Sequence, residues 1–262
     1  MSAVAHHLCP AIDDHADEHA AAINPTEAAV LTSARTRTLL KALHLGSPML
    51  PVGAFSYSQG LEWAVEAGTI VDRTGAESWI FDVLRWSIGR FEAPLLIAAH
   101  RRWTAIDDAQ VDELNRWMLA TRETRELRAE TEQLGYSLRR WCRDSAAVDA
   151  STLARLDAID TPTWPVTFAA VASSWAIGSH DMLSTYLWTW VENQVGAALK
   201  AVPLGQTDGQ KILLAAPAVI DSVAIAAVTL ASGHPREWPT QCPGLAIASS
   251  RHETQYSRLF RS

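Results

Sequence analysis

Four histidines near the start of the chain, His6, His7, His15 and His19, are the side chains best suited to bind a metal ion. His15 and His19 would share one face if this stretch were helical, as two metal ligands can, and aspartates and glutamates flank them. The surrounding sequence predicts no folded scaffold to fix these groups in space. We therefore expect at most weak, exchangeable metal binding and no firmly bound cofactor, with a plain solvated tail as the alternative.

A second candidate for chemistry is the stretch GQTDGQKI at residues 205–212, which has the glycines and lysine of a phosphate-binding loop. Its spacing differs from that motif, and Ile212 stands where a serine or threonine would bind magnesium. We interpret it as a polar turn between helices. The sequence also lacks the GxSxG and HExxH motifs, and no cysteine has an activating local environment, so we predict a protein that is not an enzyme.

The overall charge and the cysteines limit the class of protein. The formal net charge of −7 argues against binding nucleic acid or an anionic membrane, because such proteins need a positive field. The three cysteines are widely spaced and form neither a disulfide framework nor a metal knuckle. The first residues lack the basic start and apolar core of a secretory signal, so we expect a cytoplasmic protein.

The most apolar stretch, residues 212–231, is long enough to raise the question of a membrane span. Pro217 and Asp221 lie inside it, and an aspartate in the middle of a span would be costly in lipid. A helix in the core of a bundle accommodates the same composition at lower cost. We predict a buried core helix and no membrane insertion.

Several other helices can be placed from periodicity and capping residues. A short amphipathic helix is predicted from Arg35, with Leu39, Leu40 and Leu43 on its apolar face and Gly46 just beyond its end. Residues 74–77 have the spacing of a capping box at the start of another helix.

Two further features concern the helices after residue 77. Pro94 should end or kink the helix that begins at residues 74–77, at a point near Glu92, because proline removes a hydrogen bond from a helix interior. The arginines and glutamates of residues 122–143 are typical of the solvent-exposed face of a long helix. Arg122–Glu126 and Arg128–Glu132 would be neighbouring pairs on that face. A partner-binding stripe is the alternative.

No segment of useful length alternates as a strand does, and no repeat of fixed period is present. We therefore predict an all-α fold, a single-domain helical bundle of about eight to ten helices. The predicted organisation is a mobile N-terminal tail at residues 1–34, a helical domain at residues 35–244 and a C-terminal partner-binding tail at residues 245–262.

Three motifs in order give a specific resemblance: SPMLPVGAFSYSQGLE at residues 47–62, YLWTWVENQVGAALKAVPLGQTDGQ at residues 186–210, and SRHETQYSRLFRS at residues 250–262. Together they resemble the urease accessory protein UreF family, from about Leu39 to Ser262. The resemblance implies an all-α, non-catalytic scaffold that dimerises and bridges UreD, also called UreH, to the GTPase UreG. It further implies that the complex matures the urease apoprotein by handling nickel, and that the scaffold modulates the GTPase.

The resemblance also implies that the C-terminal tail becomes ordered when UreD binds. The ordered tail would pack near the aromatic loop at residues 47–60, and the two together would form a docking surface for UreG. By motif, Phe55 and Arg258 are the strongest candidates for this surface, followed by Tyr57, Tyr256, Leu259 and Phe260. Packing within the monomer is the alternative role for each of these residues.

A second function stays open at this point, a helical nickel-binding carrier that uses the N-terminal histidines. Deleting residues 1–34 separates the two functions, because a scaffold would still activate urease whereas a carrier would not. An all-α enzyme with an active site assembled from distant residues is a further alternative and requires activity from the isolated chain.

Overall fold

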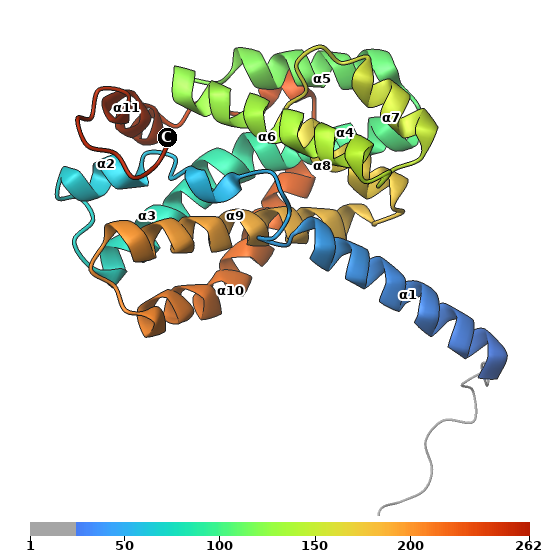
Figure 1. The fold of residues 1–262 in the computed structure, drawn as a ribbon, viewed down its shortest axis with the longest axis horizontal. Helices are drawn as coiled ribbons and strands as arrows, with labels where there is room; N and C mark the ends of the chain where they lie inside the picture. Colours follow the sequence, from blue (N-terminus) through green and yellow to red (C-terminus); the bar gives the residue numbers. More distant parts are fainter. Residues whose placement is uncertain (1–24) are drawn as a thin grey trace, which may run out of the picture. The chain divides into compact units, whose positions relative to one another are not determined.

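A computed structural model describes residues 25–262, with side chains from Ser33 onward. Residues 37–262 form one compact unit, and the residues before them are assigned to a separate one. The first helix is α1, Pro25–Leu45. The others are α2 Leu61–Glu66, α3 Arg73–Val83, α4 Ala93–Thr104, α5 Asp108–Ala120, α6 Arg125–Asp144, α7 Ala150–Asp157, α8 Trp164–Ser174, α9 Ser179–Ala201, α10 Gln206–Leu230 and α11 Pro243–His252 (Figure 1).

Short helical turns complete the described part of the chain: two 3₁₀ turns, η1 Ala54–Ser56 and η3 Pro235–Glu237, and a π-helical stretch, η2 Leu84–Glu92. The stretch η2 joins α3 to α4 without a break, so residues 25–262 hold ten separate helices, if turns are left out, and no strand. The predicted all-α, single-domain bundle is confirmed.

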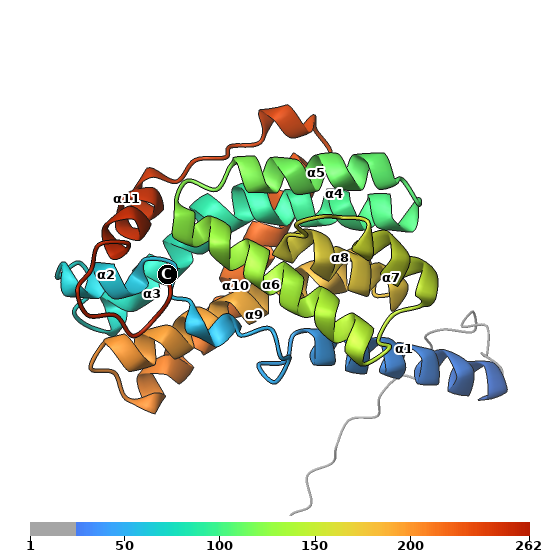
Figure 2. The same ribbon diagram turned by 45° about the horizontal axis from the view of Figure 1, so that its top comes forward.

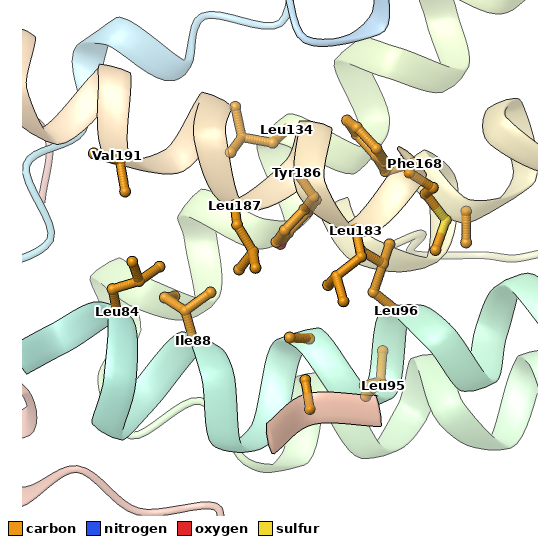
Figure 3. Close-up of a cluster of buried hydrophobic side chains, with 14 of the residues drawn as sticks. Leu84, Ile88, Leu95, Leu96, Leu134, Phe168, Leu183, Tyr186, Leu187 and Val191 are labelled. Carbon is orange, nitrogen blue, oxygen red and sulfur yellow. The ribbon is translucent and has the colours of Figure 1, made fainter. Parts of the chain in front are cut away.

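The core lies where α9 faces the continuous helix of η2 and α4, with α8 packed beside α4. Figure 3 shows Leu183 and Leu187 of α9 pointing toward Leu84 and Ile88 of η2 and toward Leu96 of α4. All of these side chains are almost completely buried. This packing explains why α9 is apolar around most of its circumference: it is covered by helices on several sides.

Of the two predicted effects of Pro94, an end or a kink of the helix near Glu92, the end is wrong, because the chain stays helical from Arg73 to Thr104. Pro94 occupies the start of α4 and has no N–H to donate, and its ring would crowd the carbonyl one turn earlier. The π-helical turn of η2 lies directly before this position. Its wider spacing of hydrogen bonds lets the helix pass the proline without ending.

Two local expectations also differ from the structure. The cap of α3 is Asp72, whose carboxylate accepts from the Gly75 N–H at 2.8 Å, so the predicted capping box at residues 74–77 is not the cap. On α1 the predicted apolar face is exposed, since Leu39, Leu40 and Leu43 are each about 60 % accessible. The buried side of that helical turn carries Ala42 and Leu45 instead.

Helix α10 is long and apolar enough, by length and composition alone, to cross a membrane, and no other helix in the described part of the chain meets that test. It packs on α9, η2, α3 and α4 through one side. Ile212, Ala216 and Ala227 on that side are fully buried, as a core helix requires. Its other side leaves Leu214 and Ile225 exposed.

Candidate partner-binding surface

The aromatic loop at residues 47–60 and the last ten residues, which we call the C-terminal strap (residues 253–262), lie side by side. The Ser58 N–H donates to a main-chain oxygen of Ser262 at 2.8 Å, and the Arg261 N–H donates to the Ser56 carbonyl at 2.8 Å. Figure 2 shows the strap passing from α11 alongside α2 to end next to the loop. Segments about 200 residues apart in sequence therefore form one surface.

The loop ends in a backbone turn that brings α2 against α11. Gln59 and Gly60 have positive φ angles of 51° and 77°. A side chain at Gly60 would place its Cβ 2.9 Å from the Cβ of Ala248 on α11, so only glycine permits this approach. Gln59 is held in its strained conformation by its own amide, which donates to Glu130 at 2.8 Å and accepts from the Trp190 indole at 2.9 Å.

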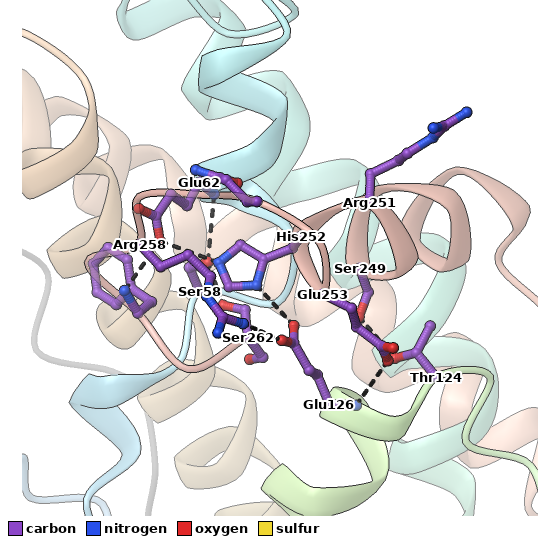
Figure 4. Close-up of polar contacts among 12 residues, drawn as sticks. Ser58, Glu62, Thr124, Glu126, Ser249, Arg251, His252, Glu253, Arg258 and Ser262 are labelled. Carbon is purple, nitrogen blue, oxygen red and sulfur yellow. Dashed lines mark hydrogen bonds and ion pairs between the residues drawn. The ribbon is translucent and has the colours of Figure 1, made fainter.

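Glu62, in the first turn of α2, holds the strap through its carboxylate. The carboxylate accepts from the backbone N–H of Leu259 at 2.7 Å and of Phe260 at 3.0 Å. It also lies 3.2 Å from Nε2 of the fully buried His252. Figure 4 shows Glu62 next to His252, to which it is joined by a dashed line. A buried carboxylate with three such partners fixes the position of the strap relative to α2.

Glu126, at the start of α6, makes the second attachment. Its carboxylate lies 2.7 Å from Nδ1 of His252 and accepts from Nη1 of Arg258 at 2.9 Å. His252 thus sits between two carboxylates, one at each ring nitrogen. Helix α11 is further tied to the start of α6 by the hydroxyls of Thr124 and Ser249, 2.7 Å apart.

The six residues predicted for partner binding separate into two groups in the structure. Phe55, Tyr256 and Leu259 are 66 %, 104 % and 70 % exposed, and the Arg258 side chain is 41 % exposed. We call these four residues the loop-strap face. Tyr57 and Phe260 are about 5 % exposed, so in this structure they pack inside the protein. Burial raises the pKa of the Tyr57 hydroxyl, against a smaller opposing effect of Arg261.

An ion pair lies deeper in the same half of the molecule. Glu92, the last residue of η2, accepts from Nη1 of Arg122 at 2.6 Å and from the Tyr186 hydroxyl at 2.7 Å. Both charged side chains are under 10 % exposed. Burial, followed by the negative charge of Glu92, raises the pKa of Tyr186 well above its usual value. Tyr186 therefore stays protonated and acts as a hydrogen-bond donor.

Glu130 is the buried carboxyl group that contacts both the loop and the strap. It accepts from the Gln59 amide and from the Ser262 hydroxyl, at 2.8 Å and 3.0 Å. Burial raises its pKa from 4.5 to about 7, although these two hydrogen bonds lower it. The negative charge of the nearby Glu92 raises the pKa of Glu130 further, and the positive charge of Arg122 lowers it.

We expect Glu130→Gln to remove a pH dependence from folding stability. The folded state holds this proton up to about pH 7 whereas the unfolded chain releases it near pH 4.5, so stability falls as pH rises between these values. The steepest loss from one group is about 1.4 kcal/mol per pH unit. Urea unfolding at pH 5, 6, 7 and 8 measures how the free energy of unfolding changes with pH. The variant should lose less stability than the natural protein between pH 5 and 7. Parallel pH curves for the two proteins would contradict this role of Glu130.

No group of three or more histidine, cysteine, aspartate or glutamate side chains that could hold a metal ion occurs among the described residues. The histidines predicted as weak metal ligands, His6, His7, His15 and His19, lie outside those residues. The stretch that resembles a phosphate loop forms the turn between α9 and α10 and the first turn of α10, where Asp208 pairs with Lys211 at 3.3 Å.

Sequence comparison identifies the family. The UreF family model matches residues 70–216. The chain is 54 % identical over 226 residues to the urease accessory protein UreF of Azoarcus sp. (strain BH72), covering 86 % of this chain and 95 % of that protein. It is 44 % identical over 228 residues to the UreF of Methylobacillus flagellatus, covering 87 % and 99 %, and 46 % identical over 227 residues to the UreF of Dechloromonas aromatica, covering 86 % and 97 %. The chain belongs to the urease accessory protein UreF family.

Proposed function

We propose that the protein is a non-catalytic scaffold that bridges UreD, also called UreH, to the GTPase UreG and modulates that GTPase during nickel delivery to the urease apoprotein. The observation that carries the proposal is the loop-strap face. The face presents the exposed side chains of Phe55, Tyr256 and Leu259 together with Arg258, and the guanidinium of Arg258 is held by the buried carboxylate of Glu126. Exposed aromatic and arginine side chains on a fixed backbone are typical anchors of a protein interface.

The two sides of the strap suit different partners. The backbone of its inner side is held by Glu62, while its outer side presents the side chain of Leu259 and the partly exposed side chain of Arg258, which also pairs with Glu126. We propose that UreG binds this outer side. UreD would stabilise the strap in its docked position. Nickel is handled by the assembled complex rather than by a resident site in this chain.

We further propose that the protein acts in the cytoplasm as a homodimer. The apolar outer side of α10, with Leu214 at 80 % and Ile225 at 63 % exposed, supports self-association because a monomer gains nothing from such a surface. Sedimentation of the isolated chain measures this, and a monomer at micromolar concentration would contradict it.

Arg258→Ala is expected to weaken UreG binding by about tenfold or more, since the face loses a guanidinium that can make a charge-assisted contact with the partner. Arg251→Ala is the matched control, because Arg251 lies on α11 and points away from the cluster in Figure 4. The measurement is retention of UreG by the purified complex with UreD, together with circular dichroism of each variant. UreG retention by Arg258→Ala equal to that of Arg251→Ala would refute the assignment.

A further inference from the structure

A cavity of about 170 Å³ lies between the aromatic loop and α9, next to the loop-strap face. Its walls are mostly apolar and include Leu45, Leu50, Val52, Trp164 and Ala197. Loop, α1, α8 and α9 each contribute to these walls, so the cavity is a feature of the assembled fold. Its volume is comparable to that of a long side chain rather than of a large ligand.

The cavity holds a carboxylate that has no partner among the described residues. Glu192 on α9 is half-buried in its lining, and within residues 33–262 its carboxylate makes no hydrogen bond and no ion pair. The neighbouring polar groups are already used: the Asn193 amide donates to the Tyr57 carbonyl, and the Thr189 hydroxyl donates to carbonyls of Gly46 and Thr185. Burial raises the pKa of Glu192, because nothing there compensates its charge.

Two residues of α9 with opposite charges, Glu192 and Lys200, line different ends of the cavity. Lys200 lines the same cavity two helical turns after Glu192, about 12 Å further along the axis. Its ammonium lies 6.0 Å from the ring of Phe55 and 5.6 Å from that of Phe260, so it occupies the end next to the loop-strap face. A cation is therefore repelled at the Phe55 end and attracted at the Glu192 end.

We propose that this cavity receives a lysine or arginine side chain of UreG, with the aliphatic stem against the apolar walls and the cationic head at Glu192. Such side chains bury their stems on apolar surface and keep the head at a polar group, which matches a pocket with one unpaired carboxylate. Phe55 belongs both to the cavity wall and to the loop-strap face, so a partner covering that face also covers the cavity. The inference rests on the proposed function, since it adds a second contact for the same partner.

Two substitutions test the cavity without disturbing the fold. Glu192→Gln keeps the size of the side chain and removes the charge. Gly196→Leu fills the cavity from α9, and a Cβ at this position meets no atom within 4 Å, while leucine favours a helix more than glycine does. We expect each variant to bind UreG about tenfold more weakly, as the loss of one charge-assisted contact or of the space for its stem predicts.

The experiment measures binding of purified UreG to the complex of this protein with UreD, with Glu113→Gln as control. Glu113 is an exposed glutamate on α5 that contacts Gln110 and does not line the cavity. If both cavity variants bind UreG as Glu113→Gln does, or if they lose UreD instead, the cavity does not receive a UreG side chain. Arg258→Ala in the same assay separates this failure from failure of the proposed function, because it tests the loop-strap face alone.

Discussion

Arg122→Met is expected to destabilise the protein by about 3–5 kcal/mol, because it leaves the carboxylate of Glu92 buried without its counter-charge. Glu92 is about 5 % exposed, and Tyr186 would be its remaining hydrogen-bond donor. Methionine fills most of the space of the arginine stem, so the loss measures the charge rather than a cavity. Urea unfolding followed by circular dichroism gives the change in the free energy of unfolding.

A matched control lies on the next helix. Arg128 pairs with Glu132 at 2.8 Å on the exposed side of α6, so Arg128→Met should cost no more than about 1 kcal/mol. The double variant Arg122→Met with Glu92→Met removes both buried charges and should be more stable than Arg122→Met alone. Equal losses for the two single arginine variants would show that the buried pair contributes no more than a surface pair.

These two arginines also show where reasoning from sequence spacing succeeds and where it fails. The predicted pair Arg128–Glu132 is present, because both residues lie on one helix and the spacing alone places them together. The predicted pair Arg122–Glu126 is wrong. Arg122 lies before the start of α6 and pairs with Glu92, while Glu126 is buried against α11 and the strap. Partners from distant segments leave no local spacing to detect.

The sequence contains a weak indication that Glu126 and Glu130 are buried. Glu126 and Glu130 lie four residues apart and in register with Leu134 and Leu138, on the buried face of α6. A glutamate at a core position of an amphipathic helix needs a partner, so this register indicates a buried polar contact. The identity of that partner, His252 or Ser262, comes only from the fold.

The helical fold and the nearness of loop and strap were predictable, the first from periodicity and the second from the motifs of a known family. The separation of exposed Phe55 from buried Tyr57 was not, since loop residues have no period that assigns them to a face. The same holds for Leu39 and Leu43 of α1, whose spacing indicates an apolar face but not whether this chain itself covers it.

Glu62→Ala is expected to release the C-terminal strap while leaving the helical domain folded. Two backbone N–H groups, those of Leu259 and Phe260, and the ring of His252 lose their shared acceptor. Each charge-assisted hydrogen bond of this kind contributes about 1.5–3 kcal/mol, so amide protection at Leu259 and Phe260 should fall by about a hundredfold. Hydrogen exchange measures this directly, and trypsin should cleave the variant faster after Arg258.

Comparison with two other variants locates the cause. Glu66→Ala, an exposed glutamate at the end of the same helix, should leave the strap protected, and Glu62→Gln, which keeps one acceptor oxygen, should give an intermediate loss. Arg258→Ala removes the contact with Glu126 but keeps Glu62, the acceptor of the Leu259 and Phe260 amides, so these two amides should lose less protection than in Glu62→Ala while UreG binding falls. If Glu62→Ala leaves the strap as protected as Glu66→Ala does, the strap is held by Phe260 and its apolar neighbours. If it releases the strap and loses UreG together, one buried acid on α2 controls whether the loop-strap face exists.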